Sequence, residues 1–370
     1  MAALYIGLMS GTSLDGVDAV LVDLGGPPLQ VLGHCSAPFP DTLKAELLAL
    51  NTPSDNELHR AALAANALVR VYAGQVLALL TQCQLRPIDI RAIGAHGQTV
   101  RHRPQEFDGT GYTLQLNQPA LLAELCGIDV VADFRSRDVA AGGQGAPLVP
   151  PFHQAFFAKP RQTTAVLNIG GISNVSVLGA EPENILGFDC GPGNALMDAW
   201  CQQHTGQAYD AEGRWAATGQ VDAALLTDLQ ADAYFSKLPP KSTGRDFFNS
   251  TWLAHKLMAH PQVLPVDVQA TLTALTAWAC ADSVRKSSPT CQTLIVCGGG
   301  ALNLELMRRL QLGLPSCVVE SSVQHGLPPL QVEATAFAWL AQQAIERKTG
   351  SLKSVTGARG ARILGAIYPA

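Results

Sequence analysis

The chain repeats one glycine-rich pattern of strand, turn and strand, and this repeat limits the possible folds more than any other feature. Residues 5–24 read YIGLMSGTSLDGVDAVLVDL, and residues 166–179 read VLNIGGISNVSVLG. Small turn residues let backbone N–H groups approach an anion closely, and Ser and Thr hydroxyls add donors. A third segment, residues 294–310, reads as a strand, a triple glycine and a helix. Together these segments predict an ATP-binding cleft between two related domains, for phosphoryl transfer or an ATP-driven switch.

The length of the chain also favours two domains. It has 370 residues, whereas single cores stop growing at about 250–300 residues. Strand and helix patterns alternate along the chain, which predicts an α/β fold built from two copies of a βββαβα unit. Residues 142–151 read GGQGAPLVPP, and this richness in Gly and Pro is typical of a boundary between domains. We therefore expect domains at residues 1–145 and 146–370, and leave open whether the C-terminal tail returns to the first domain.

Local patterns predict individual elements within this plan. Strands are expected at residues 4–8, 19–24, 31–38, 92–95, 112–116, 129–132, 185–188 and 362–368. Helices are expected at residues 40–50, 55–82, 118–126, 195–205 and 333–347, with one more inside residues 261–285.

Composition excludes several classes of protein. The net charge is −5 and no cluster of Lys and Arg is present, which argues against nucleic-acid binding. The 9 cysteines form no CxxC pair, so we expect reduced, mostly buried thiols in a cytoplasmic protein. The first residues lack the basic start of a signal peptide, and polar residues break each apolar stretch of about 18 residues. We expect neither a leader nor a membrane span.

The first glycine-rich turn is not a Walker A loop, because no GxxxxGK[ST] sequence and no phosphate-binding Lys are present. The turn joins two strands, so backbone amides and the hydroxyls of Thr12 and Ser13 would have to bind phosphate. Asp15 and Asp18 are available to Mg²⁺, Asp15 through water. An ordinary hairpin with an Asp-Gly turn is the alternative interpretation.

Carboxylates at strand ends are candidates for a catalytic base. Asp189 ends an apolar strand and precedes Cys-Gly-Pro-Gly-Asn, and catalytic groups of α/β sheets sit at such strand ends. No basic residue adjoins Asp189 in sequence, whereas Asp133 has Arg135 nearby and is better explained by an ion pair. A helix N-cap is the alternative role for Asp189.

Residues 96–99 read HGQT, a set of donors and acceptors suited to sugar hydroxyls, although a buried core histidine would look the same. Residues 241–246 read KSTGRD, which is either a ligand-binding turn or a solvated loop.

These segments together resemble one family, the anhydro-N-acetylmuramic acid kinases, a branch of the actin-like ATPase and sugar-kinase superfamily. The resemblance covers essentially the whole chain. Its motifs are MSGTSLDGVD at 9–18, HGQT at 96–99, DFRSRDVAAGGQGAPLVP at 133–150, NIGGISNV at 168–175, FDCGPGNALMD at 188–198, KSTGRDFF at 241–248, CGGGALN at 297–303 and VEATAFAWLA at 332–341, followed by TGA and LGAIYP.

The resemblance implies a reaction and a fold. The fold would be two actin-like, ribonuclease H-like domains flanking the cleft. ATP, water and 1,6-anhydro-N-acetylmuramic acid would give ADP and N-acetylmuramic acid 6-phosphate, in the recycling of cell-wall sugars. Asp189 would deprotonate the water that opens the anhydro ring, and Mg²⁺ would accompany ATP. A homodimer is also implied.

The resemblance further assigns binding residues. ATP contacts are expected from Gly11, Thr12, Ser13, Leu14, Asp15, Gly16, Val17, Asp18, Gly170, Gly171, Gly298, Gly299, Gly300 and Asn303. Sugar contacts are expected from His96, Thr99, Arg135, Asp138, Gly193 and Asn194, with Arg135 suited to the lactyl carboxylate. One departure is Cys190, where family members often have Thr.

Three other functions fit parts of the same pattern. An ordinary amino-sugar kinase would use Asp189 to deprotonate the sugar instead of water. An actin-like ATPase switch would hydrolyse ATP slowly without sugar, but leaves the FDCGPGN motif unexplained. A non-enzymatic sugar sensor would not need an intact candidate base.

Overall fold

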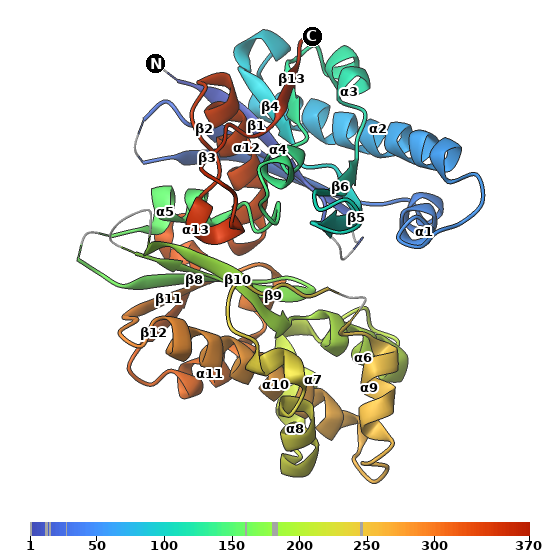
Figure 1. The fold of residues 1–370 in the computed structure, drawn as a ribbon, viewed down its shortest axis with the longest axis vertical. Helices are drawn as coiled ribbons and strands as arrows, with labels where there is room; N and C mark the ends of the chain where they lie inside the picture. Colours follow the sequence, from blue (N-terminus) through green and yellow to red (C-terminus); the bar gives the residue numbers. More distant parts are fainter. Residues whose placement is uncertain are drawn as a thin grey trace. The chain divides into compact units, whose positions relative to one another are not determined.

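The chain folds into two compact units. The computed structural model describes residues 2–11, 14, 16–26, 28–159, 161–179, 184–244 and 247–370. Unit 1 comprises Met1–Phe152 and Gln331–Ala370, and unit 2 comprises His153–Leu330 (Figure 1). This division differs from the boundary expected at residues 145 and 146. It also gives unit 1 a C-terminal segment that begins at Gln331, well before the expected tail, because a long helix of that segment packs on the first sheet.

Unit 1 is built on a six-stranded sheet in the order β13-β7-β4-β1-β2-β3. Strands β1, β2 and β3 form an antiparallel meander, and β4 and β7 continue the sheet parallel to β1. Strand β13 closes the other edge, antiparallel to β7. The strands are β1 (Leu4–Met9), β2 (Gly16–Asp23), β3 (Gln30–Pro38), β4 (Ala92–Ala95), β7 (Val130–Ala132) and β13 (Ala366–Tyr368).

Helices cover both faces of this sheet, and residues that alternate along β1 separate the two faces. Ile6 and Leu8 belong to a core cluster with the long helix α2 (Glu57–Cys83) and with α3 (Pro119–Cys126). Tyr5 belongs to a second cluster with α12 (Val332–Ile345). The unit also contains α1 (Asp41–Ala49), α4 (Ser136–Ala140), α13 (Lys353–Thr356) and a separate hairpin of β5 (Gln98–Pro104) and β6 (Gly111–Leu116).

Helix α2 combines length with an apolar composition. Among the described residues it is the one helix long and apolar enough to cross a membrane, with a mean hydropathy of 1.5 and half of its most apolar window buried. The expectation that no such stretch exists was therefore too strong. The helix packs against β2, β3 and α3, and buried core helices pass the same test of length and composition.

The close approach of α12 to the sheet depends on two glycines. A Cβ atom on Gly7 would overlap the carbonyl oxygen of Ala334, and one on Gly94 would overlap that of Phe337. The two glycines face each other on adjacent strands and leave a shallow groove on the sheet. The backbone of α12 packs directly into this groove. Figure 1 shows α12 beside β1, far apart in sequence but joined in one unit.

Unit 2 repeats this plan in a five-stranded sheet with the order β10-β9-β8-β11-β12. Strands β8, β9 and β10 form the antiparallel meander, and β11 and β12 continue it parallel to β8. The two sheets therefore share one topology, and the expected α/β class with two related units is confirmed. The strands are β8 (Thr164–Ile169), β9 (Ile172–Leu178), β10 (Leu186–Pro192), β11 (Thr293–Cys297) and β12 (Val318–Ser321).

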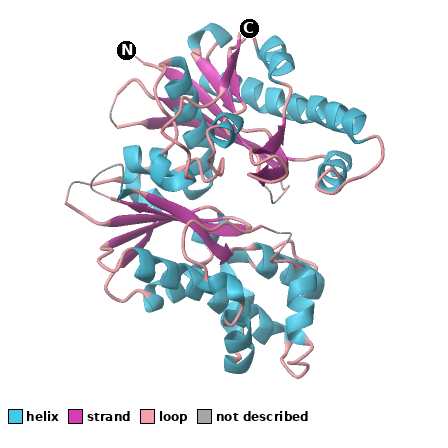
Figure 2. Ribbon diagram, in the orientation of Figure 1, coloured by secondary structure: helices cyan, strands magenta, loops and turns pink. Residues whose placement is uncertain are grey.

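One helix organises the core of unit 2. Helix α10 (Pro265–Ser287) is buried along most of its length and contacts β9, β10 and several helices (Figure 2). Its partners are α6 (Ala195–Thr205), α7 (Arg214–Thr218), α8 (Ala223–Gln230) and α11 (Leu304–Gly313), with α9 (Ser250–Leu257) packed on α6 and α8. Helices α7, α8 and α9 have no counterpart among the expected elements. Helix α5 (Pro150–Phe157) lies at the division between the units.

The close packing of α12 on Gly7 and Gly94 gives a prediction about stability. Gly94→Ala should lower the free energy of unfolding by about 1–3 kcal/mol, because the new methyl group must displace the α12 backbone. Gly74→Ala is the matched control, since nothing lies within 4 Å of that exposed position in α2. It should raise stability by up to about 1 kcal/mol through helix propensity. Denaturant titrations of both variants check this, and equal stabilities would contradict the packing described.

Candidate active site

Asp189 occupies an irregular position near the end of β10. Its paired residue on β9 is Asn174, whereas Gly191 pairs with Ser173, so Cys190 is an extra residue on the β10 side. A β-bulge of this kind bends a strand and redirects its side chains, and bulges are common beside active sites. The side chain of Asp189 is half-buried, so the carboxylate stays within reach of a ligand.

The surroundings of Asp189 come from two later segments of unit 2. The backbone N–H of Thr243 donates to Oδ2 of Asp189 over 3.0 Å, which fixes the plane of the carboxylate. The backbone N–H of Asp189 donates to the carbonyl of Lys241, and the Tyr234 hydroxyl donates to the carbonyl of Asp189. Burial, with the nearby Asp189 charge second, raises the pKa of Tyr234, so this phenol stays protonated as a donor.

Lys241 supplies a cation close to this carboxylate. Its ammonium group lies 4.8 Å from the centre of the Tyr234 ring, within cation–π range. Burial lowers the pKa of Lys241. The motif at 241–248 therefore lies beside Asp189, although Arg245 and Asp246 of that motif fall outside the described residues.

The side chain of Cys190 lies in the core of unit 2. It is fully buried in the core of unit 2, and burial, together with the hydrogen bond to Cys280, holds the pKa of its thiol well above the usual range. The thiol is therefore a neutral core group. The family's Thr at this position would lie in the same core, so its exchange for Cys does not alter a ligand contact in this structure.

Backbone hydrogen bonds join the turn of the second glycine-rich hairpin to the start of α6. Backbone N–H groups of Gly193 and Ala195 donate to the carbonyl of Gly171, and that of Asn194 donates to the carbonyl of Gly170, over 2.8–3.2 Å. A side chain at position 193 would overlap the Gly170 carbonyl. These four expected ligand-binding residues are thus brought together, and the bonds that join them already use the first amides of α6.

The triple glycine after β11 packs on the same hairpin. A Cβ atom on Gly298 would approach Asn168 and the Ile169 carbonyl, and one on Gly300 would overlap the Ile169 side chain. Gly298 has a positive φ of 75°, a second reason for glycine there. The side chain of Asn303 accepts a hydrogen bond from the Leu306 amide, so it caps α11. The backbone amide of Asn303 also donates to the carbonyl of Gly300 over 3.1 Å, so this residue is held beside the triple glycine.

The first glycine-rich turn is described in part. Thr12, Ser13 and Asp15 lie outside the described residues. Leu14 and Val17 point into the core of unit 1, which leaves only their backbones for a ligand. The Leu14 amide donates to the Gly11 carbonyl, and Gly16 packs against the backbone of β3.

Asp18 differs from its neighbours in this turn. Its carboxylate is partly exposed and lies 3.1 Å from Nε2 of His34.

His96 and Arg135 form a direct pair in unit 1. The guanidinium group donates to Nε2 of His96 over 2.8 Å and to the carbonyl of Gly145, and Nδ1–H of His96 donates to the carbonyl of Ser10. Because a guanidinium only donates and a carbonyl only accepts, the imidazole is neutral with its proton on Nδ1. Burial, reinforced by the Arg135 charge, lowers the pKa of His96 to about 3.

Asp138 is not placed for a sugar contact. Its side chain is fully buried, Oδ2 accepts from the Gly145 amide, and Oδ1 accepts from the Thr356 hydroxyl, both over 2.8 Å. The expectation of direct binding is therefore replaced by a positioning role. Asp138 holds the loop whose Gly145 carbonyl receives Arg135. Thr356 was missed, although it belongs to the C-terminal TGA motif, because sequence gives no sign that this motif returns to residue 138.

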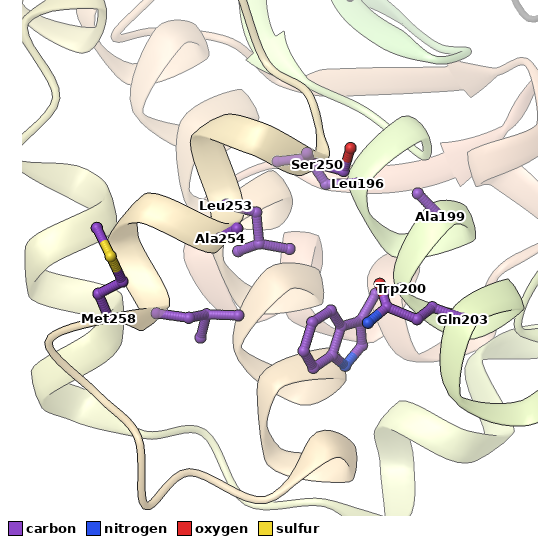
Figure 3. A pocket seen from close by; sticks show the side chains of 9 residues that line it. Leu196, Ala199, Trp200, Gln203, Ser250, Leu253, Ala254 and Met258 are labelled. Carbon is purple, nitrogen blue, oxygen red and sulfur yellow. The ribbon is translucent and has the colours of Figure 1, made fainter.

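Thr99 remains a partly exposed residue of β5, and its hydroxyl accepts from the Gln115 amide group. A cavity of about 370 Å³ lies elsewhere, between α6 and α9 (Figure 3). Its walls are mainly apolar and include Trp200, Leu253 and Met258, and none of the expected site residues lines it. Figure 3 shows Leu253 and Trp200 on opposite sides of the space between the two helices.

Two related α/β units with glycine-rich turns and a carboxylate at a strand end define a class, the actin-like ATPases and sugar kinases. Residues 3–370 match the family description "Anhydro-N-acetylmuramic acid kinase", and the chain belongs to this family. It is 63% identical to the enzyme of that name from Albidiferax ferrireducens over 100% of both chains. It is also 63% identical to that from Variovorax paradoxus over 99% of both chains. For Ralstonia nicotianae the identity is 54%, over 99% of this chain and 97% of that one.

Solved structures are more distant. The activator of 2-hydroxyisocaproyl-CoA dehydratase from Clostridium difficile has a TM-score of 0.49 and 12% identity, over 94% of this chain and 96% of that one. This similarity is too weak to bear on the fold or the activity.

The pair of His96 and Arg135 gives a titration prediction. Nitrogen NMR of histidine-labelled protein should show His96 neutral, with the proton on Nδ1, at pH 5, and His96→Gln identifies its signals. The unfolded chain binds this proton near pH 6.5 and the folded chain near pH 3. The stability contributed by neutral His96 is therefore complete above pH 6.5 and is lost as the pH falls toward 3. Protonation of His96 near pH 6.5 would contradict the geometry.

Proposed function

We propose that this kinase couples hydrolytic opening of 1,6-anhydro-N-acetylmuramic acid to phosphorylation of its O6, with ATP as donor. Membership of the family supports the substrate. The observation that carries the mechanism is the position of Asp189, a half-buried carboxylate on a β-bulge, held by the Thr243 amide. Such a group can accept a proton from a bound water while the strand keeps it rigid.

The reaction exchanges two bonds at the sugar. Asp189 takes a proton from water as the water oxygen bonds to C1 and the bond between C1 and O6 breaks. The released electron pair on O6 forms the new bond to the γ-phosphorus, and the bond from that phosphorus to ADP breaks. Phosphorylation thus captures O6 as it leaves. The cation of Lys241 lies over the Tyr234 ring, 4.8 Å from the ring centre.

The glycine-rich turns are suited to ATP phosphates. A Cβ atom on Gly170 would meet only the Ile172 carbonyl, at 3.7 Å, so space remains beside that turn for an anion. We propose that the backbones of Gly170, Gly171 and Gly299 bind ATP, together with the turn at 11–18. Gly298 and Gly300 would act by setting the turn's shape, since close packing accounts for them.

Mg²⁺ would shield the phosphate charge when bound with ATP. It commonly takes one or two carboxylates, with phosphate oxygens and waters completing the shell. The described residues contain no group of three or more potential ligands, which agrees with that mode of binding. Asp18, partly exposed, is the described candidate, and Asp15 remains a proposed ligand through water.

Arg135 is the proposed partner of the lactyl carboxylate. His96 and the Gly145 carbonyl hold the guanidinium in place, and the imidazole of His96 beside it is neutral. His96, Thr99, Gly193 and Asn194 remain candidates for the rest of the sugar. A homodimeric, cytoplasmic enzyme without membrane or nucleic-acid partners completes the proposal and rests on the resemblance and the composition.

Asp189→Asn should lower kcat by about 10²–10⁴-fold while the fold is retained, because the amide cannot accept the proton. Asp282→Asn is the matched control: its carboxylate lies on α10 of the same unit and pairs with Lys286. That variant should keep wild-type turnover. Steady-state ADP release with ATP, Mg²⁺ and the anhydro sugar measures both variants.

The path of oxygen separates the competing functions. In ¹⁸O-labelled water, with borohydride reduction to stop exchange at C1, the wild-type product should carry one label at C1 and none in its phosphate. Phosphorylation of free N-acetylmuramic acid but not the anhydro sugar would identify an ordinary kinase. Label appearing in free phosphate, regardless of sugar, would identify an ATPase switch.

Arg135→Lys should lower kcat/KM for the anhydro sugar by about 10- to 100-fold, because a lysine cannot grip a carboxylate with two parallel hydrogen bonds. The same variant should have a much smaller effect on 1,6-anhydro-N-acetylglucosamine, which lacks the lactyl group. Equal losses on both sugars would mean that Arg135 acts through the fold of unit 1 and does not bind the lactyl carboxylate.

A further inference from the structure

Two cysteines of unit 2 lie side by side outside the proposed active site. The Sγ atoms of Cys291 and Cys317 are 3.7 Å apart, and the Cys317 thiol donates a hydrogen bond to Cys291. Cys291 precedes β11 and Cys317 directly precedes β12, which are neighbouring parallel strands paired from Thr293 and Val318 onward. The two thiols are therefore held together by the sheet.

The two sulfurs lie close to the distance of a disulfide bond. Their Sγ atoms are 3.7 Å apart and would have to approach to about 2.05 Å. The amide of Val318 donates to the carbonyl of Gln292, so the chain segments carrying the two thiols are hydrogen-bonded to each other. A bond between the sulfurs needs side-chain rotation but no change of strand pairing.

The two thiols lie just beneath the surface. Cys291 is 8% and Cys317 is 5% exposed, and each directly follows two exposed residues, at positions 289–290 and 315–316. A small oxidant can reach them through local motion of these connections. Cys190 and Cys280 form another neighbouring pair, but both are completely buried in the core.

Hydrogen bonding makes the pair chemically unequal. The hydrogen bond that the Cys317 thiol donates to the Cys291 sulfur is the largest influence on the pKa of Cys291. It lowers this pKa and outweighs burial, which raises it. The same bond, with burial second, raises the pKa of Cys317. Cys291 is therefore the better nucleophile, because the thiolate is the reactive form, and Cys317 is placed to react second.

We propose that Cys291 and Cys317 form a reversible oxidation site, at which a hydroperoxide generates an intrachain disulfide. The Cys291 thiolate attacks a peroxide oxygen, the O–O bond breaks, and a sulfenic acid forms as water or an alcohol leaves. Cys317 then attacks the sulfenic sulfur, gives up its proton, and releases water. Two electrons pass from the two sulfurs to the peroxide, and a dithiol reverses the change.

The disulfide would tie β11 to β12 at the ends where these strands begin. The triple glycine of the proposed ATP site follows the C-terminal end of β11, whereas the disulfide would lie before the N-terminal end of that strand. We expect oxidation to raise the thermal stability of unit 2 and to leave the kinase rate largely unchanged. This inference is independent of the proposed function.

The test treats the full-length reduced protein with hydrogen peroxide, blocks free thiols with N-ethylmaleimide, and identifies cross-linked peptides by mass spectrometry. The protein should lose two of its nine thiols, with one cross-linked peptide joining Cys291 to Cys317. The melting temperature should rise by several degrees, on the order of 5 °C, and return after dithiothreitol.

Single variants test the order of the steps. Cys317→Ser should trap a sulfenic acid on Cys291, captured by dimedone, whereas Cys291→Ser should leave Cys317 unmodified under the same conditions. Cys35→Ser is the matched control, since that thiol lies in unit 1 on β3, and it should not alter the cross-link. Nine free thiols after peroxide, or a first disulfide between any other pair, would overturn the proposal.

Discussion

Three backbone hydrogen bonds between the start of α6 and the turn of the β8–β9 hairpin determine how unit 2 presents its expected ligand-binding residues. These bonds require the two segments of the chain to touch at Gly193, where a side chain would overlap the Gly170 carbonyl. The triple glycine after β11 packs on the same hairpin, and Asp189 lies on the strand that leads into Gly193. The proposed catalytic base and the glycine-rich turns of unit 2 are thus parts of one hydrogen-bonded arrangement, and most of these glycines serve contacts between backbones.

In unit 1, the expected sugar-binding residues are held by a different means, a series of hydrogen bonds that involve buried side chains. Thr356 and the Gly145 amide hold Asp138, the Gly145 carbonyl holds Arg135, and Arg135 holds a neutral His96. Buried polar groups are costly unless each has a partner, so the network tolerates few substitutions. It also links the C-terminal segment directly to the proposed sugar-binding arginine.

Much of the fold could be predicted from the sequence, because the repeated hairpin and the alternating elements reflect simple periodicities. The sequence also pointed to Asp189 through its strand-end position. It could not reveal the bulge at Cys190, the capping role of Asn303 or the burial of Asp138, which depend on partners distant in sequence. Helices α7 to α9 were missed because short, weakly patterned helices gain their stability from packing, α7 and α8 against α10, and α9 against α6 and α8. The division at Gln331 was missed because α12 follows unit 2 in the sequence although it packs on the sheet of unit 1.

The return of the C-terminal segment to unit 1 has a consequence for how the protein is made. Unit 2 is one continuous stretch of chain, whereas unit 1 also needs α12 and β13, which are synthesised after all of unit 2. Domains usually fold during synthesis from the N-terminus onward. Here unit 2 can complete its core while the sheet of unit 1 still has one face uncovered, because the helix that covers that face is synthesised later.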